Sequence, residues 1–336
     1  MTRQPVLSFT DRGIYCAAGD FYIDPWRPVA RALITHGHAD HARSGHQHYM
    51  ATHAALPVMR HRLGNIDAQG TDFGTVTRIG DAEVSFHPAG HVPGSAQIKV
   101  AVGGEVWVAS GDYKVEDDGL SEAFEPLQCH HFITESTFGL PVFRWRAQAD
   151  VAKELNEWWA ACADAGKTAF LGAYSLGKAQ RLLRMLDPTI GPILTHGAVE
   201  ATNAVMRAQG IALPETEQLT KDTDPKANKR AIVVAPPSAL GSTWAKRFGP
   251  SESAFASGWM QLRGIRRRRA GDRGFVISDH ADWTGLMSAI KATEAEHIYV
   301  THGYTDIFAR YLREEGWQAE VVPTEFGGED DSEGET

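Results

Sequence analysis

The feature that most constrains the fold is a short apolar run, ALIT, that leads directly into the sequence HGHADH at residues 36–41. Such a run is typical of a buried strand that ends at a cluster of polar side chains. Alternate residues of an extended chain point to the same side, so His36 and His38 can bind one metal ion. Asp40 and His41 lie further along the turn, where they can reach a second ion. A surface loop with unrelated histidines is the alternative, and the dense HxHxDH spacing disfavours it.

Two later segments complete a site of this kind. HPAGHVPGS places His91 at the end of a predicted strand, and VWVASGDYK places Asp112 after another. A carboxylate at the end of a buried strand is costly unless it is paired or metal-bound, although either residue alone fits an ordinary turn. Asp24, in FYIDPW, also follows an apolar run and can orient one of the histidines through a hydrogen bond. Imidazole and carboxylate ligands suit zinc, manganese or iron.

The composition is that of an ordinary globular protein, with 43% hydrophobic and 22% charged residues in a chain of 336. No run approaches about 18 apolar residues and no apolar signal segment is present, so we expect a cytoplasmic protein without a membrane partner. The cysteines have no CxxC spacing, which indicates neither a disulfide framework nor a thiolate metal site. The net charge of −9 hides a basic run at 263–273 and an acidic end, EFGGEDDSEGET. The charge therefore does not exclude a nucleic-acid partner.

The hydrophobic period changes near residue 140. Before it, the pattern predicts short strands and turns, at 31–35, 82–88, 96–110 (a hairpin with a Gly-Gly turn) and 130–136. After it, helices and strands alternate, which indicates a parallel α/β unit. We predict helices within 144–166, 175–186, 198–210, 238–249, 282–293 and 304–316.

These patterns predict an α/β fold with an inserted domain. We expect a first domain that is formed by residues 1–140 and completed by 275–328, a smaller inserted α/β domain at 141–274, and an acidic disordered tail at 329–336.

The order HxHxDH, AGH, SGD resembles the metallo-β-lactamase fold, an αββα sandwich that binds two metal ions at its strand ends. ITESTFG with Glu135, ISDHADW with His280 and YVTHGY with His302 are similar to the three further motifs of the β-CASP nucleases, whose accessory domain is inserted after the first of these motifs. The resemblance extends from about Asp24 to His302. Within the group, DFYIDPWRPVARALITHGHADHA and TESTFGLPVFRW are most similar to the bacterial exonucleases associated with ATP-dependent DNA ligases.

This resemblance implies two divalent metal ions, zinc or manganese, that activate a water for attack on a phosphodiester. The ligands of the first ion are His36, His38, His91 and Asp112. The ligands of the second ion are Asp40, His41, Asp112 and His302. The catalytic residues are Asp40, His280 as the general acid, and Glu135, which keeps His280 oriented and protonated. A histidine at a helix start and a carboxylate at a strand end are the structural alternatives for the last two.

Other residues are candidates for contacts with substrate. Ser175, Gly177 and Lys178 lie at a predicted helix N-terminus after a strand, which suits a phosphate, although an ordinary capped turn has the same pattern. Ser278, next to the general acid, is a candidate contact for a terminal phosphate. The run 266–269 fits either a polyanion track or a solvated hinge. His196, in a third Thr-His-Gly triplet, is expected to be structural.

The resemblance implies a metal-dependent phosphodiesterase that acts as a DNA exonuclease from a 5′ end in DNA repair. Its expected partners are nucleic acid, with DNA preferred over RNA, together with a DNA ligase and other repair proteins. The main alternative is an RNA-processing nuclease, since RNA-processing β-CASP members carry histidine in the last motif, as His302 does here, where the Artemis-like DNA members carry valine. A small-molecule hydrolase would need neither Glu135 nor His280, and a scaffold without metal would not need a full ligand set.

Overall fold

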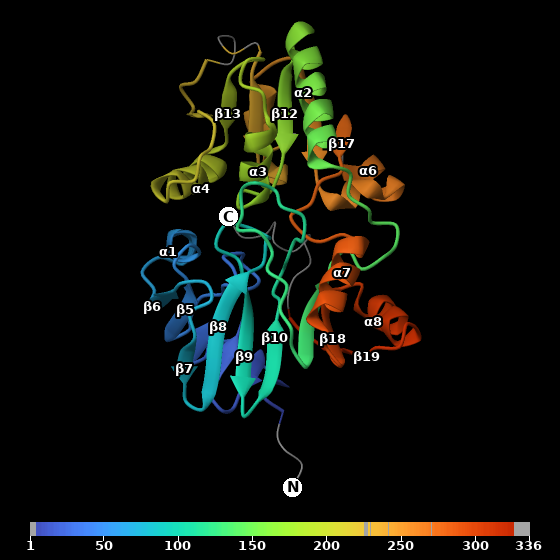
Figure 1. Ribbon diagram of the computed structural model, residues 1–336. Coiled ribbons are helices and arrows are strands. Elements are labelled where there is room, and N and C mark those ends of the chain that lie inside the picture. The colour runs from blue at the N-terminus through green and yellow to red at the C-terminus, as the bar shows by residue number, and fades with distance from the viewer. Residues whose placement is uncertain (1–4, 225–227, 229, 241, 270, 326–336) are drawn as a thin grey trace. The chain divides into compact units, whose positions relative to one another are not determined.

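The chain folds into two compact units, each with its own hydrophobic core (Figure 1). The computed structural model describes residues 5–224, 228, 230–240, 242–269 and 271–325. The first unit runs as far as Phe143 and resumes at Asp279, and the second runs from Arg144 to Ser278. The expected acidic tail, 329–336, lies outside the described residues. None of the helices in the described ranges has both the length and the apolar character needed to cross a membrane.

The first unit contains two mixed sheets. One has the strand order β1-β2-β3-β4-β5-β6, in which the pairings from β3 to β6 are parallel. Its strands are β1 (Ser8–Phe9), β2 (Ile14–Cys16), β3 (Phe21–Ile23), β4 (Arg31–Leu33), β5 (His48–Thr52) and β6 (Ala68–Thr71). The other has the order β19-β18-β11-β10-β9-β8-β7. Its strands are β7 (Thr77–Ile79), β8 (Ala82–Pro88), β9 (Ala96–Val102), β10 (Glu105–Ala109), β11 (His131–Ser136), β18 (His297–Gly303) and β19 (Gln318–Val321).

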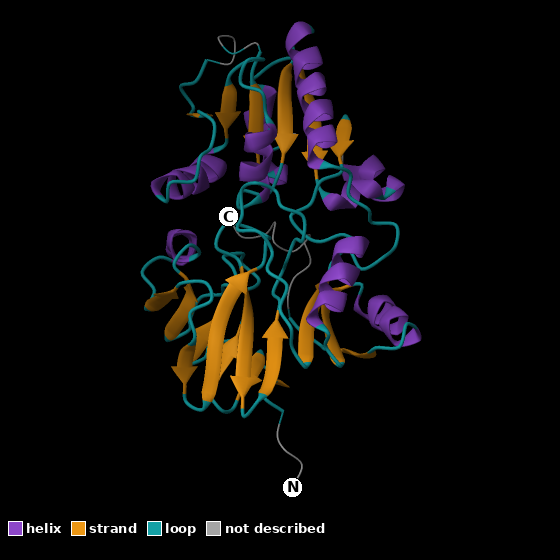
Figure 2. Ribbon diagram, viewed as in Figure 1, coloured by secondary structure: helices purple, strands orange, loops and turns teal. Residues whose placement is uncertain are grey.

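Alternation of apolar residues along these strands gives the two sheets a shared core and an outer layer of helices. The inner faces pack Ile14, Phe21 and Leu33 of the first sheet with Phe86, Ile98 and Ile133 of the second. Full burial of each such side chain contributes about 1.5–3 kcal/mol. Helix α1 (Leu56–Leu63) covers the outer face of the first sheet, and α7 (Trp283–Thr293) and α8 (Thr305–Glu314) cover that of the second (Figure 2). The layers are therefore helix, sheet, sheet, helix.

The predicted hairpin is present, and its turn explains the need for two glycines. Strands β9 and β10 pair in antiparallel fashion around Gly103 and Gly104, whose φ angles are 55° and 89°. A two-residue turn with positive φ at both positions matches the twist of the flanking strands.

The second unit is a parallel α/β unit, as the alternation of helices and strands predicts. Its sheet has the order β14-β13-β15-β12-β16-β17, and all of its pairings are parallel. The strands are β12 (Thr168–Gly172), β13 (Ile193–Thr195), β14 (Glu217–Gln218), β15 (Ile232–Ala235), β16 (Ser251–Ala256) and β17 (Arg273–Phe275). The helices are α2 (Gln148–Asp164), α3 (Lys178–Met185), α4 (Gly197–Ala208), α5 (Thr243–Lys246) and α6 (Arg263–Arg269).

Three local predictions differ from the structure. Helix α1 lies where the sequence predicts only short strands and turns. Its apolar face is narrow and holds three buried residues, Leu56, Val58 and Met59, so the sequence shows no clear helical period. The helix predicted for 238–249 is a 3₁₀ turn, Pro237–Ala239, followed by α5, which starts afresh where Ser242 caps its N-terminus. The basic run, for which no helix is predicted, forms the helix α6 over Arg263–Arg269.

Candidate metal centre

The ends of several strands in the first unit bring together six of the seven side chains predicted as metal ligands in two close groups, and Asp40 lies beside them. Parallel strands β10, β11 and β18 end at the same edge of their sheet, so the residues that follow them meet there. Asp112 follows β10, and His302 lies at the end of β18. The HGHADH segment follows β4 of the opposite sheet, and His91 lies in the connection from β8 to β9.

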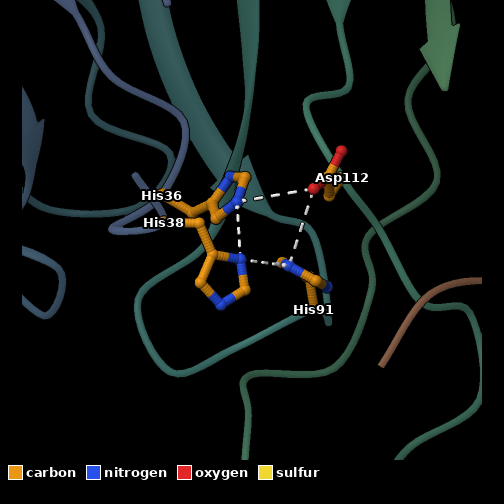
Figure 3. Close-up of side chains that lie close together, drawn as sticks. All are labelled: His36, His38, His91 and Asp112. Carbon is orange, nitrogen blue, oxygen red and sulfur yellow. Dashed lines mark hydrogen bonds and ion pairs between the residues drawn. The ribbon is translucent and has the colours of Figure 1, made fainter. Parts of the chain in front are cut away.

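Four of these side chains form a closed ring (Figure 3). His38 Nδ1 lies 3.1 Å from His36 Nε2 and 3.0 Å from His91 Nε2. Asp112 Oδ2 lies 3.5 Å from His36 Nε2 and 3.8 Å from His91 Nε2. A tetrahedron with metal–nitrogen bonds of about 2.0–2.1 Å has edges of about 3.3 Å. The spacing of the four ligand atoms therefore fits a single tetrahedral ion.

The protonation of these imidazoles also suits metal binding. Burial, together with the neighbouring His41, holds the pKa of His36 well below its usual value. Burial and the nearby His280 lower the pKa of His91 to about 3. Both rings are therefore neutral near pH 7, the form that a metal ligand requires.

A second group of ligand atoms shares Asp112. Its Oδ2 atom lies 3.5 Å from His41 Nε2, and its Oδ1 atom lies 2.7 Å from His302 Nε2. Asp40 Oδ2 is 3.7 Å from His41 Nε2 but does not join the three ligand atoms that lie within 4.8 Å of one another.

Negative charge dominates this second group. Burial alone would lower the pKa of His41, but the carboxylates of Asp112, Asp40 and Asp24 raise it well above its usual value. Burial raises the pKa of Asp112, yet the nearby His41 and His302 outweigh that effect and hold it well below the usual range. Asp112 is therefore ionised, and a divalent cation at this position would neutralise the excess charge.

Outer hydrogen bonds orient the predicted ligand rings. Asp24 Oδ2 lies 2.8 Å from His41 Nδ1, the role expected for it, and its Oδ1 atom accepts a 2.8 Å bond from the Thr35 backbone N–H. Thr35 Oγ1 in turn lies 3.1 Å from His36 Nδ1. With Nδ1 engaged in this way, Nε2 of His36 and of His41 faces the other ligand atoms, an arrangement that raises ligand basicity and fixes the tautomer.

One orienting residue is absent from the sequence-based prediction. The backbone carbonyl of Asp279 lies 2.9 Å from His91 Nδ1, although 188 positions separate the two residues. The contact is made by a backbone atom, so the residue type carries no signal for it. Only the position of Asp279 beside His280 could have drawn attention to it.

The predicted general acid and its partner lie together next to the ligand groups. His280 Nδ1 is 2.8 Å and 3.0 Å from the two carboxylate oxygens of Glu135. Glu135 is fully buried, and its Oε1 atom also accepts a 2.8 Å hydrogen bond from the Tyr113 backbone N–H. Ligand atoms of Asp112, Glu135 and His280 lie within 4.8 Å of one another. The pair is thus placed to hold a proton beside the carboxylate that the two ligand groups share.

The remaining candidates lie in the second unit. Gly177 is the N-cap of α3 with φ of 84°, and Lys178 is buried with its Nζ atom 4.5 Å from the centre of the Tyr174 ring. The Oγ atom of Ser175 is buried and has no hydrogen-bond partner among the described atoms. The Ser278 backbone carbonyl accepts a hydrogen bond from Arg181.

The third Thr-His-Gly triplet belongs to the second unit, whereas the predicted metal ligands belong to the first. His196 follows β13 of the second unit and is the N-cap of α4, where its Nδ1 atom accepts a 3.2 Å hydrogen bond from the Ala198 backbone N–H. The structural role expected for this histidine is confirmed.

The chain is similar to several known proteins. No family model matches the chain. It is 30% identical over 321 residues to a protein named probable DNA ligase from Opitutus terrae, a match that spans 92% of this chain and 30% of that protein. It is 30% identical over 119 residues to Endoribonuclease ysh1 of Aspergillus fumigatus, which spans 34% of this chain and 13% of the relative. These relatives support the resemblance to the β-CASP group.

The chain is also similar to an archaeal protein and to a solved structure. Transcription termination factor FttA of Methanothermobacter thermautotrophicus is 29% identical over 163 residues, or 45% of this chain and 25% of the relative. This chain thus spans less than a third of the length of each of these three curated relatives. A solved structure of a protein of unknown function from Enterococcus faecalis V583 has a TM-score of 0.59 and 11% identity, covering 88% of this chain and 80% of that one. That likeness shows a shared fold.

Proposed function

We propose that this chain is a metal-dependent nuclease with the β-CASP form of the metallo-β-lactamase fold. The observation that carries the proposal is Asp112, because one of its oxygens faces His36, His91 and His41 while the other faces His302. A carboxylate in this position can bridge two cations. Two divalent ions held here, zinc or manganese, would supply an activated water and neutralise charge on the phosphodiester oxygens.

The residues of the chain itself supply the proton. Glu135 engages Nδ1 of His280, which leaves Nε2 as the nitrogen that protonates the departing oxygen. The buried carboxylate stabilises the imidazolium form and fixes the ring plane. A hydrolase that cleaves small molecules with good leaving groups has no use for such a buried pair, so the pair favours a phosphodiester with an alkoxide leaving group.

Within the nuclease class we propose a DNA exonuclease that acts from a 5′ end, in repair, with a DNA ligase as a partner. The long match to a protein named probable DNA ligase supports DNA and a link to ligation. Most of that relative lies outside the match, which is consistent with a nuclease segment working beside a ligase segment. We assign the terminal phosphate to Ser175, Gly177, Lys178 and Ser278, since the buried Ser175 hydroxyl has no hydrogen-bond partner among the described atoms and a lysine attracts phosphate.

An RNA nuclease is the second candidate. The last motif carries His302, whose Nε2 atom is 2.7 Å from Asp112, and several curated relatives are named endoribonucleases. The ligand geometry is the same for both substrates, so the choice depends on contacts outside the metal centre.

Digestion of matched DNA and RNA strands tests the proposal. Single-stranded oligonucleotides of one sequence, labelled at either end, are incubated with the protein and zinc or manganese. We expect loss of a 5′ label as a mononucleotide from DNA, abolition of that loss by a chelator, and slower loss in His280→Ala. His48→Ala is the matched control, because His48 is exposed and pairs with Asp67 at the surface. Faster degradation of RNA would favour the second candidate, and no cleavage of either strand with metal present would refute a nuclease.

A further inference from the structure

The helix α6 of the second unit has an unusual concentration of positive charge. It is seven residues long and contains five arginines in the sequence RGIRRRR. The side chains of Arg263, Arg266, Arg267 and Arg268 are exposed. Its one large apolar residue, Ile265, packs against the small core of Phe255 and Met260. The helix is therefore anchored by one side chain and presents guanidinium groups to solvent.

This charge is not neutralised within the described part of the chain. None of the four exposed guanidinium groups has a carboxylate at ion-pair distance among the described residues. The nearby Asp272 is engaged elsewhere, since its carboxylate accepts hydrogen bonds of 2.7 Å from the Ser253 backbone N–H and 3.1 Å from Ser253 Oγ. Clustered like charges destabilise a short helix, so a cluster of this kind with no acidic partner among the described residues suits an external polyanion.

The side chains of α6 favour a nucleic-acid backbone over a membrane surface. A helix of this length extends about 10 Å, and one strand of a duplex presents a phosphate about every 3.4 Å along its axis, so about three phosphates fit. All the cations are arginine, whose planar guanidinium bonds phosphate oxygens in bidentate fashion. A membrane-binding helix places large apolar side chains in the lipid interface, whereas Ile265 is directed into the protein core.

We propose that α6 binds the phosphate backbone of the nucleic-acid substrate, at phosphates other than the one hydrolysed at the metal centre. This inference rests on the proposed nuclease function and adds to it a second contact surface. The surface is sequence-independent, since phosphate contacts position a strand without reading its bases. Its effect is on substrate affinity and on the rate for long strands rather than on the chemical step.

Salt-dependent binding tests this surface. The variant R266A/R267A/R268A is compared with the unaltered chain for binding of a labelled single strand, in chelator, over a range of salt concentrations. Removal of three phosphate contacts lowers the slope of log affinity against log salt by about two, at about 0.7 per contact. R266K/R267K/R268K keeps most of the slope, and thermal melting of both variants checks folding. K153A/R184A/K291A, which removes three exposed cations elsewhere, leaves the slope unchanged.

Hydrolysis of bis(p-nitrophenyl) phosphate separates this inference from the proposed function. The triple alanine variant is expected to cleave this small diester at the unaltered rate. An unchanged salt slope in that variant would overturn the inference even if the chain is a nuclease. So would binding to anionic vesicles that is lost in the variant while strand binding is kept. If the chain cleaves no diester but the slope still falls by about two, α6 is a nucleic-acid surface and only the proposed hydrolysis fails.

Discussion

Replacement of Glu135 by glutamine tests how the proton reaches the leaving group. The amide is close in shape to the carboxylate, and its oxygen can still accept the 2.8 Å hydrogen bond from the Tyr113 backbone N–H. It removes the negative charge that faces His280 Nδ1 at 2.8 Å and 3.0 Å. Glu135→Gln is therefore preferred to alanine, which would leave a buried N–H without a partner at a cost of about 1–3 kcal/mol.

The expected loss follows from the hydrogen bond that the carboxylate makes to the imidazolium. Hydrogen bonds to charged groups contribute about 1.5–3 kcal/mol, which is about a 10- to 150-fold change in rate. Glu135 is fully buried, so solvent does not screen the interaction. The loss falls on kcat, because the pair acts on the departing oxygen and does not need to touch the ground-state substrate.

Two substrates with different leaving groups provide the assay. Single-turnover rates are measured on a DNA strand, whose leaving oxygen needs a proton, and on bis(p-nitrophenyl) phosphate, whose nitrophenolate leaves without one. Glu135→Gln and His280→Ala should each slow DNA cleavage within the range above and slow the small diester much less. Metal content, measured on the same samples, should be unchanged. Equal losses on both substrates would refute the assignment of His280 as general acid and Glu135 as its positioning residue.

Four further changes have outcomes that the structure specifies. Asp112→Asn removes the shared charge, and elemental analysis should show weakened binding of both metal ions, whereas loss of only one would contradict a bridging role. Asp24→Asn weakens the 2.8 Å contact to His41 and should lower affinity for the second ion about 10- to 100-fold by titration. Gly303→Ala places a Cβ 2.3 Å from the Ser136 carbonyl oxygen at φ of 88°, so calorimetry should show a lower melting temperature together with weaker metal binding through the displaced His302. Burial lowers the pKa of His46 to about 4, so below pH 6.5 the unfolded chain binds a proton that the native chain rejects. This residue alone should lower stability by about 2 kcal/mol between pH 7.5 and pH 5, and urea unfolding in chelator should show a fall smaller by that amount in His46→Gln.

Sequence patterns single out the candidate ligands that the structure brings together, because metal binding requires residue types that are unusual at the ends of buried strands. Neither packing nor turn formation requires four ligand-type residues in HGHADH after a buried strand, together with Asp112 at the end of another. Contacts made by backbone atoms, and backbone conformation itself, cannot be read from residue types in this way. The carbonyl of Asp279 and the positive φ of Asp24, at 42°, depend on how distant segments pack, and a single sequence does not encode that packing in its residue types.

The secondary structure shows the same division. β8 spans Ala82–Pro88, the seven residues whose alternation predicts it, because one face of that strand is buried and periodicity reports burial. α1 and α6 are absent from the prediction, since α1 holds few buried residues and α6 has one apolar anchor. When a helix is stabilised by a few tertiary contacts and lacks an amphipathic stripe, hydrophobic periodicity does not predict it.

The proposed general-acid pair has a consequence for the inserted unit. Glu135 lies on β11 shortly before the chain leaves the first unit, and Asp279 and His280 are the first residues on its return. The hydrogen bond between Glu135 and His280 therefore closes a loop of 145 positions that contains the whole second unit. Closing so long a loop with an unstructured chain would carry an entropic cost that grows with length, whereas a folded insert fixes most of that chain in advance. The same short return segment also supplies the carbonyl that orients His91. Disorder in the second unit should thus weaken proton delivery and the first metal site together, although none of the proposed metal ligands lies in that unit.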